Sequence, residues 1–156
     1  ISVGYMPQKS YAFRMSAEKN ILLRGGDEKR AKELMGRLGI QGLAKNRADR
    51  LSGGETARMA LARLMMGSYD LVILDEPTAA LDPIAEAEIY SKFNDIAGDK
   101  TAIYISHRLS SCKFCDEIAV FHEGAVIQQG SHASLVADTN GKYFELWNAQ
   151  AQYYTE

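Results

Sequence analysis

The sequence predicts an α/β fold with a mostly parallel sheet and a small helical insertion near its start. Two observations predict it. The apolar run from Leu71 to Leu74 is typical of a strand covered on both faces, as in a parallel sheet, and the β-branched and aromatic stretch from Thr101 to Ser106 indicates a second buried strand. Between them, Asp82-Pro83 is a strong helix start, with an N-cap residue followed by proline at the first helical position. Strands that alternate with helices in this way favour parallel pairing.

The earlier part of the chain predicts a strand and two helices. Residues 1–8 form a short strand that runs into a loop. The spacing of four apolar residues predicts an amphipathic helix over residues 27–40, capped by Asp27 and stopped by Gly39; these are Ala31, Leu34, Met35 and Leu38. Residues 41–50 are polar and looped, and a second helix follows residues 51–54 and runs to about Met66.

The later part of the chain predicts a hairpin and two closing helices. Residues 117–122 and 125–128 are joined through Glu123-Gly124, a sequence typical of a tight turn. The helices are expected over residues 133–138 and 141–153. Cys112 and Cys115 form an isolated C-x-x-C, which we interpret as two small side chains on a short helix, since redox or metal chemistry would need further ligands.

Composition bounds the class of protein. The 156 residues are 46% hydrophobic and 24% charged, which leaves room for one sizeable core. The 18 basic and 20 acidic side chains give a net charge of -2, so we expect no nucleic-acid partner. No apolar run approaches the roughly 18 residues that cross a bilayer. The first residue is Ile1 and no signal peptide precedes it, so we expect a piece of a longer product.

The segment Leu71-Val-Ile-Leu-Asp-Glu-Pro77 carries two acids at the end of a predicted strand. Ligands of open α/β sheets bind at the carboxyl ends of the strands. Asp75 is placed there to hold Mg²⁺, directly or through water, and Glu76 to orient and polarise an attacking water. The alternative is a strand that ends in a solvated acidic turn.

The segment Leu51-Ser-Gly-Gly-Glu55 opens a predicted helix. The backbone N–H groups of Gly53 and Gly54 and the partial positive charge of the helix start favour an anion, and Ser52 adds a hydroxyl donor. The alternative is an ordinary glycine-rich N-cap.

Five motifs in this order resemble the ATP-binding cassette (ABC) family, over nearly the whole chain. They are Tyr5-Met-Pro-Gln8 (glutamine loop), Leu51–Glu55 (signature), Leu71–Pro77 (Walker B strand and catalytic glutamate), Ala80-Leu81-Asp82 (D-loop) and Ile105-Ser-His-Arg108 (switch histidine). The resemblance implies a P-loop NTPase-like core whose Walker A part is missing. Residues 9–66 would be its helical and signature subdomain, and residues 1–8 and 67–156 the remainder of the catalytic core with C-terminal helices.

The resemblance also implies a role for each motif residue. Gln8 would contact Mg²⁺ and the attacking water, Asp75 would serve the metal and Glu76 would be the general base. His107 would hydrogen-bond the γ-phosphate and Asp82 would sit at a dimer seam. Ser52, Gly53 and Gly54 would bind the γ-phosphate of ATP held by a second subunit.

The function implied is ATP hydrolysis that powers a membrane transporter, with ATP and Mg²⁺ as cofactors. The partners would be a second nucleotide-binding domain and the transmembrane domains, at the cytoplasmic face of the membrane. The stretch from Gln41 to Arg50 is shorter than in most exporters and resembles the compact helical region of importer ATPases. The tail from Gly130 to Trp147 resembles exporters, and this longer match favours export. Alternatives are a non-transport cassette ATPase of the translation-factor or DNA-repair type, and an inactive truncated fragment.

No G-x-x-x-x-G-K-[ST] phosphate loop occurs in the sequence. We therefore expect this chain to be inactive alone. We also expect the missing part to remove a strand beside residues 71–74, which would leave an open sheet edge there and favour self-association.

Overall fold

The computed structural model describes residues 1–98 and 100–152, the side chains of residues 93–97 and 152 excepted. The chain forms two compact units, Ile1–Ser106 and His107–Glu156. Among the described residues, no helix combines the length and the apolar character needed to cross a membrane.

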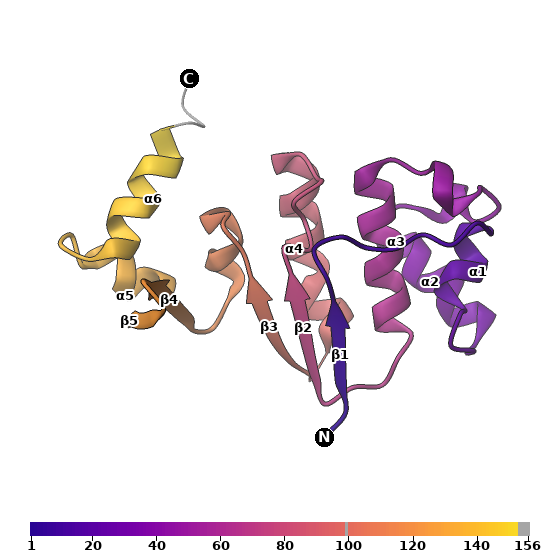
Figure 1. Cartoon of the computed structure of the whole chain (residues 1–156), viewed down its shortest axis with the longest axis horizontal. Helices are drawn as coiled ribbons and strands as arrows, with labels where there is room; N and C mark the ends of the chain where they lie inside the picture. The colour runs from indigo at the N-terminus through magenta and orange to yellow at the C-terminus, as the bar shows by residue number, and fades with distance from the viewer. Residues whose placement is uncertain (99, 153–156) are drawn as a thin grey trace. The chain divides into compact units, whose positions relative to one another are not determined.

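The first unit is built on a three-stranded parallel sheet (Figure 1). Its order is β1 (Val3–Met6), β2 (Leu71–Asp75) and β3 (Thr101–Ile105), with β2 in the centre. Met6 lies opposite Leu74, and Asp75 lies opposite Ile105. The strands therefore end at one common edge, and the predicted parallel α/β layout is confirmed.

The prediction of an open edge beside residues 71–74 is wrong. β2 pairs with β1 along one side and with β3 along the other, because the strand at the start of the chain occupies the position beside β2. Within the described part of the chain, the free edges belong to β1 and β3.

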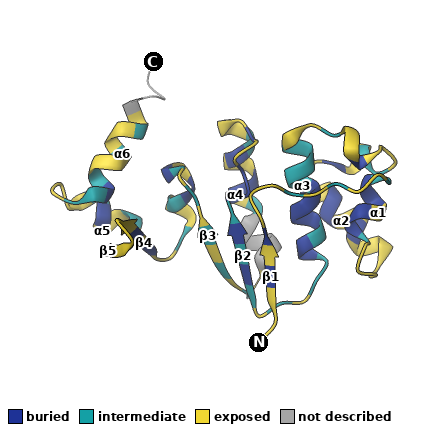
Figure 2. Ribbon diagram, in the orientation of Figure 1, coloured by how far each residue is buried: buried dark blue, intermediate teal, exposed yellow. Residues whose placement is uncertain are grey.

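Among the described residues, one face of the sheet is buried and the other is partly or fully exposed, which corrects the expectation that β2 is covered on both faces. Met6, Val72 and Leu74 are buried in the core of this unit. On the opposite face, Tyr5 and Ile103 are exposed, as the colouring of β1 and β3 in Figure 2 shows. The alternation has the period of two expected of a strand with one buried face.

In the described residues of the first unit, the α-helices are α1 (Ala17–Ile21), α2 (Glu28–Arg37), α3 (Gly53–Met65) and α4 (Pro83–Ala97). Helices α1, α2 and α3 group together on one side in Figure 1, and two short 3₁₀ turns, Gln41–Leu43 and Ala48–Arg50, join α2 to α3. The predicted helices over 27–40 and from 51–54 to 66 are confirmed to within a few residues. Asp27 caps α2 by accepting the N–H of Lys29 at 2.9 Å.

The second unit, as far as residue 152, is a hairpin with three helical segments. Strands β4 (Ile118–His122) and β5 (Ala125–Gly130) pair antiparallel, and the turn residues Glu123 and Gly124 have φ of 49° and 79°. These left-handed values are those of a tight primed turn, as predicted. The helical segments are η3 (Leu109–Phe114), a 3₁₀ helix that contains Cys112 and is followed directly by Cys115, α5 (His132–Ala137) and α6 (Lys142–Gln152). Tyr153, at the end of the last predicted helix, lies outside the described residues.

Candidate functional site

The two acids predicted at the end of a strand lie on a tightly held turn. Asp75 is the last residue of β2, and Glu76 follows it with a φ of 48°, a value that is costly for any residue except glycine. The N–H of Glu76 donates to the carbonyl of Ile105, at 2.9 Å, and the residue is only 8% exposed. The fold thus holds this glutamate in a strained backbone conformation, which costs about 1–3 kcal/mol.

Strand β1 contributes to the same edge of the sheet. The Tyr5 hydroxyl donates a hydrogen bond to Asp75 Oδ2 at 3.2 Å. Partial desolvation of the hydroxyl, together with the adjacent Asp75 carboxylate, raises the pKa of Tyr5 above its ordinary value. Gln8 is exposed and lies two residues beyond the end of β1, and therefore at the carboxyl edge where β2 presents Asp75.

A buried polar cluster fixes the loop that runs from Glu76 to α4. The Thr78 hydroxyl donates to Glu86 Oε1 at 2.8 Å and lies 3.2 Å from the Tyr90 hydroxyl, and all three side chains are buried. At the end of the loop, Asp82 Oδ1 accepts the N–H groups of Ile84 and Ala85, both at 3.0 Å. The predicted N-cap is therefore confirmed. The backbone donors, with the N–H of Ala85 contributing most, lower the pKa of Asp82.

The signature segment forms the start of α3. Ser52 Oγ accepts the N–H of Glu55 at 3.2 Å, and Glu55 Oε2 accepts the N–H of Ser52 at 2.9 Å, which is a reciprocal capping box. Ser52 and Gly53 are exposed, so the start of this helix is open to a ligand.

The structure brings the signature and the D-loop together. A Cβ on Gly53 would lie 3.2 Å from the Ala80 Cβ, and one on Gly54 would lie 3.0 Å from Leu81 Cδ2. The two glycines therefore allow close packing against the residues immediately before Asp82. This contact connects the helix start to the loop that carries Glu76.

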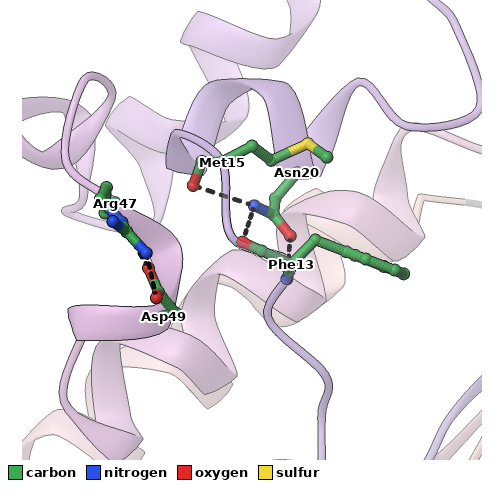
Figure 3. Close-up of polar contacts among 5 residues, drawn as sticks. All are labelled: Phe13, Met15, Asn20, Arg47 and Asp49. Atoms are coloured by element: carbon green, nitrogen blue, oxygen red, sulfur yellow. Dashed lines mark hydrogen bonds and ion pairs between the residues drawn. The ribbon is translucent and has the colours of Figure 1, made fainter.

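The segment after Gln8 is tied to the signature helix by two polar side chains, the buried Asn20 and the half-buried Arg63. Asn20, which is fully buried, accepts the N–H of Phe13 at 2.9 Å and donates to the Phe13 and Met15 carbonyls at 3.0 and 3.4 Å (Figure 3). Arg63, on α3, donates to the carbonyl of Asn20, to its Oδ1 and to the carbonyl of Tyr11, at 2.8, 2.8 and 2.9 Å. The fold thus joins residues 11–20 rigidly to the helix that begins at the signature.

A second contact reaches the residues just before the signature. The N–H of Ala48 donates to the Met15 carbonyl at 2.8 Å, and a bidentate ion pair joins Arg47 to Asp49, with N–O distances of 2.9 and 2.6 Å (Figure 3). The Arg47 guanidinium lowers the pKa of Asp49. These contacts fix the backbone of residues 47–49, directly before the signature starts at Leu51.

His107 is the first residue of the second unit and follows the last residue of β3 by two positions. It is exposed, and its carbonyl accepts a hydrogen bond from the Gln150 side chain.

Among the other predicted site residues, Gln8, Asp75 and Glu76 lie at one edge of the sheet, and Ser52, Gly53, Gly54 and Asp82 lie where α3 meets the loop before α4. The motifs did not reveal the contacts of Tyr5, Asn20 and Arg63, because no pattern along the chain relates residues that are 43 or 70 positions apart.

Comparison with known proteins decides the family. The family model described as "ABC transporter" matches residues 1–79. The chain belongs to the ABC transporter family. The two predicted acids and the signature fall within the matched range, which confirms the resemblance read from the motifs.

This ABC chain is similar to several transport proteins. The chain is 41% identical over 72% of its length to the ABC multidrug transporter MDR5 of Trichophyton rubrum, of which it covers 9%. It is 36% identical over 94% of its length to the lactococcin transport/processing ATP-binding protein LcnC-like of Lactococcus lactis, of which it covers 22%. It is 33% identical over 95% of its length to the mitochondrial iron-sulfur clusters transporter ATM1 of Kluyveromyces lactis, of which it covers 23%.

A solved structure shows the same fold. The chain matches a bacterial Atm1-family ABC exporter with ATP bound with a TM-score of 0.87 and 31% identity, covering 96% of this chain and 29% of that one. The ABC ATPase fold predicted from the sequence is thereby confirmed. The chain spans less than a third of each of these proteins.

Proposed function

We propose that this chain supplies the hydrolytic and signature parts of the ATP sites of an ABC exporter, whose ATP-driven dimerisation powers translocation. The observation that carries the proposal is the acidic turn after β2. There Glu76 is held in a left-handed conformation and bonded to β3, beside an aspartate at the end of a parallel strand. Backbone strain kept in place by its surroundings is concentrated at functional sites.

Glu76 acts in this proposal as the general base. Its backbone is fixed by the bond to Ile105, so one of its carboxylate oxygens would accept a proton from the attacking water without first being ordered. Gln8, on the neighbouring strand end, would orient the same water with its amide. Positioning of this kind supplies much of the catalysis of phosphoryl transfer.

The residues present fit Mg²⁺ bound together with a nucleotide. Mg²⁺ in phosphoryl-transfer sites takes one or two carboxylates, and its remaining ligands are phosphate oxygens and water. Asp75, oriented by the Tyr5 hydroxyl, offers such a carboxylate. The described residues contain no group of three or more acidic, His or Cys side chains that would hold a metal without a nucleotide. When bound, the ion would neutralise phosphate charge.

The start of α3 fits the γ-phosphate of ATP. The capping box uses the N–H of Glu55 and the Ser52 hydroxyl oxygen, and the exposed helix start still offers backbone N–H groups and its partial positive charge. We infer that Ser52, Gly53 and Gly54 bind ATP held by a second nucleotide-binding domain, with Asp82 at the seam between the domains. His107 would contact the γ-phosphate from the end of β3.

The direction and the partners rest on the relatives. The matching solved structure is that of an exporter, and the ATM1 and MDR5 relatives are transporters. We infer that this chain works with transmembrane domains and a second nucleotide-binding domain, at the cytoplasmic face of the membrane.

Substitution of Glu76 tests the proposal. In the assembled transporter that contains this chain, Glu76→Gln keeps the size of the side chain and removes its basicity, so we expect kcat for ATP hydrolysis to fall about 100-fold or more with ATP binding retained. Glu123→Gln is a matched control, because Glu123 is a second glutamate with a positive φ, 49°, and lies in the exposed hairpin turn. If Glu76→Gln hydrolysed ATP at the rate of Glu123→Gln, the proposed base would be wrong.

A further inference from the structure

A side chain of α6, that of Gln150, binds two backbone groups of the loop that contains His107. Gln150 Nε2 donates to the His107 carbonyl at 2.6 Å, and the N–H of Leu109 donates to Gln150 Oε1 at 3.0 Å. One carboxamide thus binds an acceptor and a donor of the backbone two residues apart, as a neighbouring peptide group would in a sheet. Both ends of the amide are used, so its orientation is defined.

Gln150 is itself held by a firmly packed helix. Tyr143 is only 1% exposed, and its hydroxyl lies 2.8 Å from His132 Nδ1. The Trp147 ring stacks on the Tyr143 ring at an interplanar angle of 12°, and Lys113 Nζ lies 4.8 Å from the centroid of the Trp147 ring. Positions 143, 147 and 150 follow the i, i+4, i+7 spacing of one helix face. Tyr143 and Trp147 therefore fix the helix face that also carries Gln150.

The rest of the loop is held by local hydrogen bonds from Ser111. The Arg108 carbonyl accepts the N–H and the hydroxyl of Ser111 at 3.3 and 2.6 Å, and Leu109 and Ser111 are buried. The backbone is thus held at each residue from His107 to Leu109, whereas His107 itself is exposed.

We propose that Gln150 is a positioning residue for His107. By holding the His107 carbonyl and the Leu109 N–H, it fixes the backbone from which the imidazole extends, and so reduces the freedom that must be lost when the imidazole meets a γ-phosphate. A catalytic contact has to be held to within about 0.5 Å, and displacement by about 1 Å can cost about 100-fold in rate. This inference rests on the proposed contact of His107 with ATP.

A double-mutant cycle in the assembled transporter tests the inference. Gln150→Ala should lower kcat for ATP hydrolysis about tenfold or more, with KM for ATP changed by less than about twofold. The double variant with His107→Ala should be no slower than His107→Ala alone, because Gln150 acts through His107. Asn148→Ala, which removes an exposed amide from the same helix, should match the parent.

The outcomes separate the two proposals. Parental activity of His107→Ala would overturn the proposed role of the histidine, and the positioning role with it. An impaired His107→Ala beside a fully active Gln150→Ala would overturn the positioning role alone. So would a double variant that is slower than His107→Ala by the factor seen for Gln150→Ala, because the two effects would then be independent.

A second variant keeps the test decisive if Gln150→Ala fails to fold. Gln150→Glu preserves the side-chain length and the acceptor for the Leu109 N–H, but removes the donor to the His107 carbonyl. We expect slow hydrogen exchange at Leu109 in both the parent and Gln150→Glu, with kcat lowered in the variant alone. Protection of Leu109 together with parental kcat in Gln150→Glu would contradict the inference.

Discussion

The hydroxyl of Thr78 stabilises the loop that joins the proposed base to the D-loop, and Thr78→Val removes it with little change in shape. The hydroxyl donates to the buried Glu86 carboxyl at 2.8 Å and lies 3.2 Å from the buried Tyr90 hydroxyl. Removing one partner of a buried hydrogen bond leaves the other group unsatisfied, which costs about 1–3 kcal/mol. We therefore expect Thr78→Val to lower the free energy of unfolding by about 2 kcal/mol.

Urea unfolding, followed by circular dichroism, measures the effect, and Thr78→Ser is the matched control. The serine keeps the hydroxyl and removes one buried methyl, which costs about 1 kcal/mol. At about 2–4 °C per kcal/mol for a chain of this size, valine should lower the melting temperature by about 4–8 °C. If valine were no more destabilising than serine, the hydroxyl would contribute little and the reasoning would be refuted.

Three further predictions concern side chains in other parts of the molecule. Asn20→Ala should lower the free energy of unfolding by about 3 kcal/mol, because several hydrogen bonds worth about 1 kcal/mol each are lost around a buried side chain; thermal unfolding measures this. Burial raises the pKa of Cys115 to about 11, so alkylation by iodoacetamide at pH 8 should be about 100-fold slower than for a free thiol. Asp82 has a lowered pKa in the folded chain, so its contribution to stability is present above the ordinary aspartate value of about 3.9 and is lost as the pH falls through the folded value; urea unfolding of the parent and Asp82→Asn from pH 7 to pH 2 should show their difference shrinking over that window.

Each of these predictions has a control. Asn46→Ala removes an exposed amide and should leave the free energy of unfolding almost unchanged. If Asn20→Ala lowered the free energy of unfolding no more than Asn46→Ala, the proposed hydrogen-bond network would be contradicted. Cys115 should react at the free-thiol rate in urea, and rapid reaction in the folded chain would refute its burial. A parent–variant difference for Asp82 that stayed constant down to pH 2 would mean that the carboxylate charge does not contribute to the cap.

Local signals along the chain were enough to predict much of the fold. The helix over residues 28–37 follows from its apolar spacing and the Asp27 cap, and α3 follows from Ser52 and the two glycines. The hairpin follows from Glu123-Gly124. In each case the deciding interactions join residues close together in the sequence, where propensity and capping act.

The remaining features depend on distant residues. Helix α1 has only five residues and is stabilised by bonds such as that from the Ala17 N–H to the Asn46 carbonyl, which no local pattern reveals. The apolar run of β2 predicted burial on both faces, whereas Leu71 and Ile73 are only partly buried, because hydrophobicity alone does not say which elements cover a sheet.

The candidate site divides in the same way. The motifs identified the acids, the signature and the histidine, because their chemistry requires particular residues at short spacings. They did not identify Gln150 or Arg63, whose contacts span 43 positions and are created only when the chain folds.

A calorimetric titration of the purified chain with Mg-ATP, with phosphate release measured in parallel, tests the central claim most directly. The claim is that these 156 residues carry the base and the signature of ABC ATP sites but take the phosphate-binding loop from outside this sequence. We predict no binding tighter than about the millimolar range, equivalent to about 4 kcal/mol, and no turnover. Micromolar binding, or phosphate release that Glu76→Gln abolishes, would contradict the account, because the phosphates would then be held by other residues of this chain.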